Sequence, residues 1–265
     1  MTSTMPAKAR NNNKTPMWQT LLAVAFWVAV WQGLAVCIGH NGLFLATPLQ
    51  TVQTLWRLLP TADFWHRVGF SALRILTGFV LAVTVGLLLG ACGARWRWFG
   101  TLVGPVMQLI RAMPVASFVI LALLWVSGKN LSVIVSFTHV LPVVYAGTVG
   151  GIADTDPALL EMAKVYRLPL GKRLRYIWLP GMFPSFCENC IAAMGMCWKS
   201  GVSAEVIGLP DHSVGDALYR AKITISTPEV FAWTLVIVLL SATLSTLAAW
   251  ALRRAKRALC GEVEG

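Results

Sequence analysis

The sequence predicts an all-α membrane protein with about six transmembrane helices. Hydrophobic residues make up 57% of its 265 residues and charged residues only 12%, and the mean hydropathy is +0.67. This composition is typical of chains whose solvent is lipid, and it argues against a soluble enzyme. In addition, stretches without charge recur along the chain at the length of about 20 residues that one membrane crossing needs.

Five segments are predicted as spans because each is long and free of charge. They are residues 17–38, 75–94, 112–128, 130–153 and 230–252. A sixth candidate, residues 184–208, contains Glu188, Lys199 and Glu205, so hydropathy alone would score it poorly. We include it because charged side chains within a span can face the interior of a helix bundle.

The distribution of lysines and arginines supports six spans, since these residues gather on the cytoplasmic side of membrane proteins. With six spans, one set of segments carries the basic residues of positions 8–14, 95–97, 164–175 and 253–257. The opposite set holds only Arg57, Arg67, Lys129, Arg220 and Lys222. Both termini and the loop of residues 154–182 are therefore predicted to be cytoplasmic. This topology also explains the net charge of +11, so no nucleic-acid partner is expected.

The basic loop carries a spaced motif. Glu161 and Ala163 are followed by Ile177, Leu179 and Pro180. This pattern resembles the EAA loop of ABC importer permeases, the binding-protein-dependent components of the bacterial inner membrane. The family pattern is E-A-A, three residues, Gly, nine residues, Ile, one residue, Leu-Pro. The resemblance therefore implies a permease.

Two positions depart from the family pattern, and a second segment narrows the resemblance. Met162 replaces the first alanine, and Arg167 stands where the family usually has glycine, which leaves the turn geometry open. Residues 198–208, WKSGVSAEVIG, are similar to the nitrate, sulfonate and taurine branch of the family. The resemblance covers about residues 70–250. It implies the type I ABC importer permease fold over residues 17–258, flanked by tails at 1–16 and 259–265.

The resemblance also implies the function and the partners. The chain would be the permease subunit that forms the translocation pathway for a small, anionic solute delivered by an extracytoplasmic binding protein. A second copy of the chain would complete a homodimer within the lipid bilayer, and two ATP-binding subunits would carry ATP and magnesium. This chain has no G-x-x-x-x-G-K-[ST] sequence, so ATP hydrolysis is expected on those separate subunits. No catalytic residue and no cofactor are expected here.

Local signals predict two helices in the loop. Asp156 and Pro157 form a strong helix start, and Leu168-Pro169 disfavours continuation beyond about residue 166. A second helix over residues 171–178 is predicted to end at Leu179-Pro180. The resemblance implies that the first helix, including Ala163, lies in a groove of the ATPase. It assigns the following residues to coupling: Glu161, Met162, Ala163, Arg167, Gly171, Ile177, Leu179 and Pro180.

Lys199, Ser200 and Glu205 are the candidate residues of the substrate pathway. Charged groups within a span usually face protein or water because exposure to lipid is costly. Lys199 and Glu205 differ by roughly 120° around an ideal helix, so a direct pair is not expected. A cation here would suit an anionic substrate. The alternative is that each charge pairs with another helix or with the second subunit.

Two alternative functions each have a sequence feature in their favour. An ion-coupled secondary transporter would use Lys199 and Glu205 as its coupling site, but the inverted repeats that mark such transporters are not seen. A membrane enzyme with a metal or redox site could use Cys187 and Cys190 or the histidines. However, a lone C-x-x-C lacks a second ligand pair, and cysteine in a span behaves as a small packing residue. The four histidines, at positions 40, 66, 139 and 212, show no ligand spacing. No metal site is therefore predicted.

Overall fold

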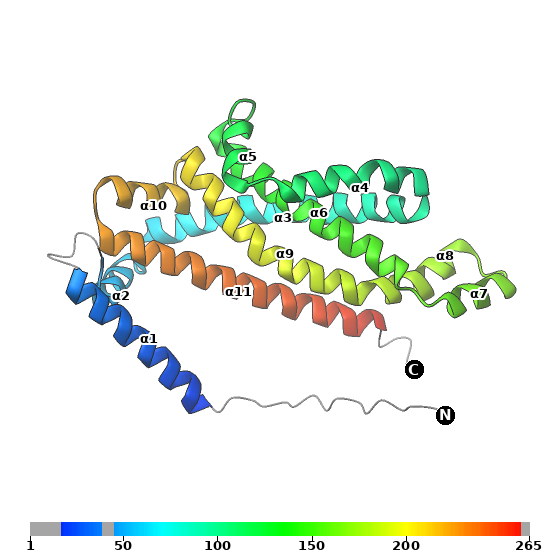
Figure 1. Cartoon of the computed structure of the whole chain (residues 1–265), viewed down its shortest axis with the longest axis horizontal. Coiled ribbons are helices and arrows are strands. Elements are labelled where there is room, and N and C mark those ends of the chain that lie inside the picture. The colour runs from blue at the N-terminus through cyan, green and yellow to red at the C-terminus, as the bar shows by residue number, and fades with distance from the viewer. Residues whose placement is uncertain (1–16, 39–44, 261–265) are drawn as a thin grey trace, which may run out of the picture.

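The computed structural model describes residues 17–38 and 45–260, and every regular element in these ranges is a helix (Figure 1). The predicted tail of residues 1–16 lies outside the described residues, as do residues 261–265. The elements are α1 Met17–Ile38, α2 Pro48–Leu58, α3 Ala62–Arg95, α4 Arg97–Ala112, α5 Val115–Ala122, α6 Gly128–Ala153, α7 Pro157–Val165, α8 Leu170–Arg173, the π-helical turn η2 Leu174–Trp178, α9 Leu179–Gly208, α10 Val214–Ile223 and α11 Thr227–Cys260.

In the described ranges, four helices are long and apolar enough to cross a membrane, namely α1, α3, α6 and α11. The bent pair α4–α5 adds a fifth if it is counted as one span. Helix α9 has 30 residues. At 1.5 Å per residue it is ~45 Å long, more than the ~30 Å thickness of the hydrocarbon core. Its charged residues explain why hydropathy does not select it. The all-α membrane fold is confirmed, and the count of six spans stays a prediction.

The boundaries of the third predicted span, residues 112–128, are wrong. Helix α4 ends at Ala112, α5 begins at Val115, and the two helices meet at 102°. Met113 and Pro114 between them have extended backbone conformations, with ψ of 130° and 132°. Proline lacks an N–H and disfavours a helical conformation in the residue before it, so it divides the apolar run into two helices. Helix α3 also differs, because it begins at Ala62 and not near residue 75.

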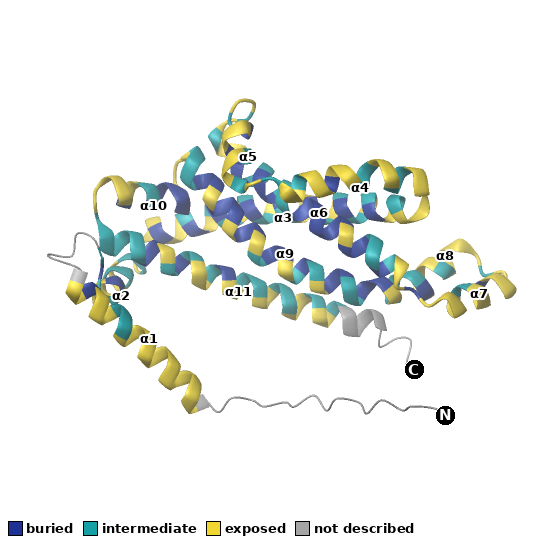
Figure 2. Ribbon diagram, viewed as in Figure 1, coloured by how far each residue is buried: buried dark blue, intermediate teal, exposed yellow. Residues whose placement is uncertain are grey.

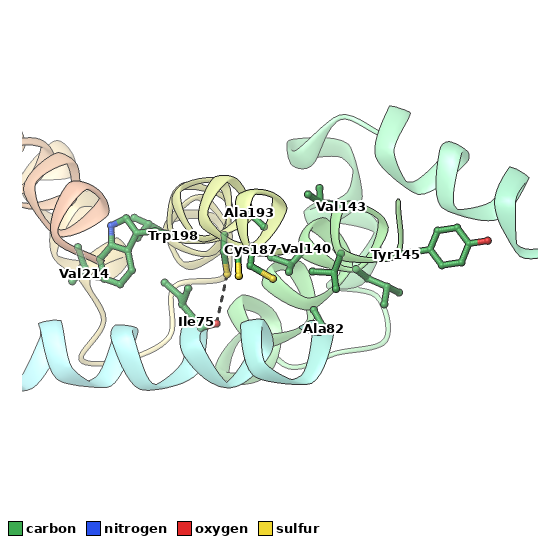
Figure 3. Packing of buried hydrophobic residues seen from close by; sticks show 14 of the residues in the cluster. Ile75, Ala82, Val140, Val143, Tyr145, Cys187, Ala193, Trp198 and Val214 are labelled. Carbon is green, nitrogen blue, oxygen red and sulfur yellow. Dashed lines mark hydrogen bonds between the residues drawn. The ribbon is translucent and has the colours of Figure 1, made fainter. Parts of the chain in front are cut away.

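Helix α6 is the centre of the bundle and packs most extensively against α3 and α9 (Figure 1). Buried residues gather on these helices, whereas α1 and α4 are largely exposed (Figure 2). Figure 3 shows Val140, Ala193 and Trp198 within the core cluster. Cys187 lies in the same cluster, and the Cys197 thiol points to the carbonyl oxygen of Ile75 at 3.7 Å. These cysteines pack in the core, in agreement with the packing interpretation of the sequence.

Glycines on α3 allow its close approach to α6. An added Cβ at Gly78 would collide with the carbonyl oxygen of Val133, and one at Gly90 would come within 2.6 Å of the Thr148 Cβ. Gly86 meets Val144 in the same way. Small residues at such spacing let two helix backbones come close where lipid provides no hydrophobic driving force. The glycine stripe therefore serves packing within this chain.

Replacement of Gly78 by alanine should destabilise the bundle. Because the new methyl group would meet backbone, which cannot rotate away, we expect a loss of about 1–3 kcal/mol. Gly69→Ala is the matched control, since an added Cβ on this residue of the same helix meets no atom within 4 Å. Thermal unfolding of the detergent-purified variants measures the difference. Equal melting temperatures for the two variants would contradict the tight α3–α6 contact.

Candidate functional site

Helix α7 begins as the sequence predicts. The carboxylate of Asp156 accepts a hydrogen bond from the Ala158 N–H at 2.8 Å, and Pro157 occupies the first turn, where a missing N–H costs nothing. The helix ends at Val165, within one residue of the predicted end. The start and the length of the first helix in the 154–182 loop are thus confirmed.

The turn after α7 depends on Arg167, which has a positive φ of 46°. The N–H of Arg167 donates to the carbonyl of Lys164 at 3.1 Å, and the N–H of Leu168 donates to that of Ala163 at 3.0 Å. These two bonds define a Schellman motif, whose left-handed residue is usually glycine. Arg167 therefore makes the turn that glycine makes more easily, at a conformational cost of about 1–2 kcal/mol.

The predicted end of the second loop helix at Leu179-Pro180 is wrong, because the chain stays helical from α8 through η2 into α9. A proline inside an α-helix removes one N–H and its ring clashes with the carbonyl of the residue four positions earlier, here Tyr176. The π-helical turn ends at Trp178, two residues before Pro180, and the Leu179 N–H donates to the Leu174 carbonyl, five residues back. This wider turn is how the chain accommodates the proline without a break.

The expected orientation of α7 needs correction. Ala163 is only 2% exposed, so it is covered by this chain and is not available to a partner. In a Schellman motif the residue after the left-handed one often contacts the residue five positions earlier, here Leu168 and Ala163. Ile177 is likewise buried, whereas Glu161 and Gly171 are exposed. The alanine of the motif therefore packs inside the loop and does not form part of its outer surface.

One exposed face of α7 is apolar, whereas Glu161 and Lys164 are exposed elsewhere on the same helix. The large apolar side chains that α7 and its last turn expose, with exposures between 42% and 78%, are those of Leu159, Met162, Val165 and Tyr166. Residues 159, 162 and 166 follow helical spacing, so they share one face. We call these four residues the α7 stripe. Of them, sequence reasoning named only Met162, although the i, i+3, i+7 spacing was a signal for the others.

Lys199 borders a cavity of 370 Å³ between α9 and α11. The cavity also contacts Gly195 on α9 and the hydroxyl-bearing Ser241 and Ser245 on α11, together with apolar residues of α11. Among the residues that the structure describes, Lys199 has no carboxylate within salt-bridge distance. An unpaired cation beside two hydroxyl groups can attract and hydrogen-bond an anion. Ser241 and Ser245 were not found from the sequence, because nothing in it indicates that α11 faces Lys199.

The other two pathway candidates lie elsewhere. Ser200 is buried and its hydroxyl donates to the Cys197 carbonyl of the same helix at 3.1 Å. Glu205 is fully buried, and one of its oxygens accepts from the Ser71 hydroxyl at 2.7 Å and from the Gly215 N–H at 3.3 Å. The structure therefore separates Lys199 from Glu205, as the 120° difference predicted, and places neither Ser200 nor Glu205 at the cavity.

Glu205 joins three helices at the end of the bundle opposite the loop. Its carboxylate lies on α9, Ser71 lies on α3, and the Ser71 hydroxyl also accepts from the Val214 N–H of α10 at 2.9 Å. A carboxylate at a helix N-terminus is favourable, because the first N–H groups are unpaired and carry partial positive charge. Arg67 of α3 adds a second link, since its guanidinium donates to Asp216 of α10 at 3.0 Å.

A match to a protein family identifies the class of protein to which this loop and this helix bundle belong. Residues 69–259 match the family described as binding-protein-dependent transport system inner membrane component. The chain belongs to this family. It is therefore a multi-pass permease of the inner membrane, and the motif residues lie in the segment from α7 through η2 to the start of α9.

Several curated relatives resemble the permease over most of their length. The putative aliphatic sulfonates transport permease protein of Escherichia coli is 29% identical over 82% of this chain and 84% of its own. Its Bacillus subtilis counterpart is 26% identical over 80% and 77%. The nitrate import permease protein of Synechococcus elongatus is 23% identical over 92% and 91%.

A solved structure is similar to the permease in fold. It is the crystal structure of a bacterial alginate ABC transporter in complex with an alginate pentasaccharide-bound periplasmic protein. The TM-score is 0.57 at 13% identity, and the alignment covers 91% of this chain and 95% of the other. The type I ABC importer permease fold inferred from the loop motif agrees with this likeness.

Removal of the Glu205 carboxylate should loosen α10. In Glu205→Ala, the buried Ser71 hydroxyl and the Gly215 N–H lose their acceptor, which costs about 1–3 kcal/mol for each group left unsatisfied. Glu205→Gln keeps one acceptor oxygen and should be milder. Limited proteolysis between residues 209 and 213, together with thermal unfolding, measures both effects. If Glu205→Ala is as protected and as stable as the parent protein, the carboxylate does not hold α10.

Proposed function

We propose that this permease imports a small organic or inorganic anion, with an aliphatic sulfonate as the first candidate. ATP hydrolysis takes place on two separate subunits, and a second copy of the chain completes the pathway. The observation that carries the ATP-driven part of the proposal is the exposed α7 stripe. It lies beside a helical path that runs without a break from α8 to the opposite end of α9. The sulfonate, nitrate and taurine permeases among its relatives support the choice of an anion.

The α7 stripe is the surface that binds the ATPase. Four neighbouring apolar side chains at the end of a membrane bundle are unfavourable in water, and together they suit a groove of a partner protein. Movement of α7 on ATP binding passes to α9 through α8 and η2, since packed helices move as rigid bodies. Glu205 then carries the displacement from α9 to α10.

The two ends of the bundle face opposite sides of the membrane. The loop end, with α7 and α8, lies in the cytoplasm together with both termini, as the distribution of lysine and arginine requires. The α10 end faces outward and meets the substrate-binding protein. One relative in fold is itself in complex with a periplasmic protein, which supports such a partner here.

The cavity at Lys199 is the anion contact within the membrane. Its cation attracts the substrate, and the hydroxyl groups of Ser241 and Ser245 replace part of the water that the anion loses. A weak contact of this kind suits transport, because a substrate must leave the pathway as well as enter it.

Charge on the α7 stripe should uncouple the complex. Tyr166 is 74% exposed in the free chain and, in this proposal, becomes buried when the ATPase binds. Tyr166→Asp should therefore leave folding and membrane insertion unchanged, whereas ATPase binding should fall at least tenfold, because the new carboxylate would be buried without a partner. Tyr166→Phe retains the ring and is the matched control. Co-purification of the ATPase and substrate-stimulated ATP hydrolysis in proteoliposomes measure the loss.

Ala163→Asp gives a different result, because Ala163 is buried inside the loop. This variant should reduce the stability of the permease itself, whereas Tyr166→Asp should not. Normal ATPase binding and ATP hydrolysis with Tyr166→Asp would show that the α7 stripe is not the docking surface.

Lys199→Ala should raise the KM for an aliphatic sulfonate about tenfold at unchanged protein abundance, because the attraction between cation and anion is lost. Lys199→Arg retains the charge and should recover most of the uptake. Uptake of radiolabelled sulfonate into proteoliposomes with the ATPase and the binding protein measures KM. Unaltered KM in Lys199→Ala would remove Lys199 from the substrate pathway, and lower abundance of both variants would indicate a structural role.

A further inference from the structure

We propose that the permease binds an anionic phospholipid in a groove at the loop end of the bundle. The groove has a volume of 610 Å³ and lies between the end of α3, the end of α6 and the segment from α8 to the start of α9. It is separate from the Lys199 cavity and from the α7 stripe, because it shares no residue with either.

The lining of the groove fits an acyl chain. Leu87 and Ala91 of α3, Ile152 of α6 and Leu174 of η2 present apolar side chains, and the cavity surface is almost entirely apolar. These residues belong to helices that cross the membrane or adjoin such helices, so the groove opens at the level where lipid tails meet the protein. An acyl chain is the apolar ligand that is always present at this place.

The rim of the groove fits a phosphate headgroup. Arg95 at the end of α3 and Arg175 in η2 both contribute to the lining, and both are exposed. Neither arginine has a carboxylate within 4 Å in the described part of the chain. Arginine binds phosphate oxygens through several donors at once, and basic pockets between transmembrane helices at this depth are suited to anionic headgroups.

Two tryptophans fix the depth of the groove in the bilayer. Trp96 follows directly on the last residue of α3, and Trp178 directly precedes α9, and both line the groove. Tryptophan is enriched at the boundary between lipid and water, because its ring is apolar and its N–H is polar. The groove therefore places its apolar part on the side of the tails and its two arginines at the headgroups, which is the polarity of a phospholipid.

Because the rim is formed by α3 on one side and by η2 on the other, a bound lipid bridges the membrane bundle and the ATPase-coupling segment. Its phosphate would bind Arg95 and Arg175 together and so restrict the separation of α3 and η2. The lipid is thus a structural ligand of the joint between α3 and η2.

Native mass spectrometry of the full-length permease tests the proposal. The protein is released from nanodiscs that contain equal amounts of phosphatidylglycerol and phosphatidylcholine. The parent protein should retain phosphatidylglycerol preferentially, and Arg95→Gln with Arg175→Gln should reduce this retention about tenfold. Arg97→Gln, which removes a nearby charge outside the groove, is the matched control and should retain lipid as the parent does.

A second variant tests the apolar part of the groove. Ala91→Trp keeps both arginines but fills the space, and it should also reduce retention of phosphatidylglycerol. Soluble glycerol phosphate at millimolar concentration should not displace the lipid, since it has no acyl chain.

Three results would overturn the proposal. The first is equal retention of the two lipids by the parent protein. The second is full retention of phosphatidylglycerol by the double arginine variant. The third is loss of the permease dimer in Ala91→Trp with unchanged lipid retention, which would assign the groove to a second copy of the chain.

Discussion

The close approach of α3 to α6 is the constraint on which the rest of the permease depends. In a bilayer, the tails of lipids are as apolar as leucine, so helices do not associate to escape water. They associate where backbones come near enough for many weak contacts, and Gly78, Gly86 and Gly90 provide that opportunity along most of one helix face. Helix α9 packs against both α6 and α3, with Gly201 close to Ile75 and Ser136, so its position depends on this pair.

Side-chain hydrogen bonds between charged groups and neighbouring helices tie the described helices together at the α10 end. Glu205 and Arg67 tie α10 to α9 and α3 through buried or half-buried hydrogen bonds, and the local hydrogen bond of Ser213 to Asp216 starts α10 at a defined place. At the loop end, by contrast, α7 is held by backbone hydrogen bonds of its own turn and presents apolar side chains outward. One end is thus closed by the chain itself, and the other is suited to a partner.

The sequence predicted those parts of the permease that depend on local signals. Asp156 and Pro157 predicted the start of α7, and the charge-free runs predicted the boundaries of α1 and α6 to within two residues. The loop motif identified the family. Hydropathy placed the third span wrongly, because an average over an apolar run does not show that Pro114 divides the run into two helices.

Other features required three-dimensional information. The family's usual glycine at position 167 left the turn geometry open, and the structure shows that the backbone of Arg167 adopts the positive φ itself. The burial of Ala163 beside this turn was not indicated by the sequence. The neighbours of Lys199, Ser241 and Ser245, are about forty residues away and lie on a helix with hydroxyl groups at several positions. Which of these faces α9 depends on the rotation of α11, and that rotation is set by packing.

The π-helical turn also makes the orientation of α7 sensitive to insertion or deletion of a residue. A π turn results when one residue more than an α-helix accommodates is placed between two helical segments. Each residue of an α-helix turns the chain by about 100°, so loss of one residue from 174–178 would rotate everything before it by that angle about the axis of α9. The α7 stripe would then point in another direction while every side chain in it stayed the same. The number of residues between α8 and α9 therefore sets the direction of the α7 stripe independently of which residues they are.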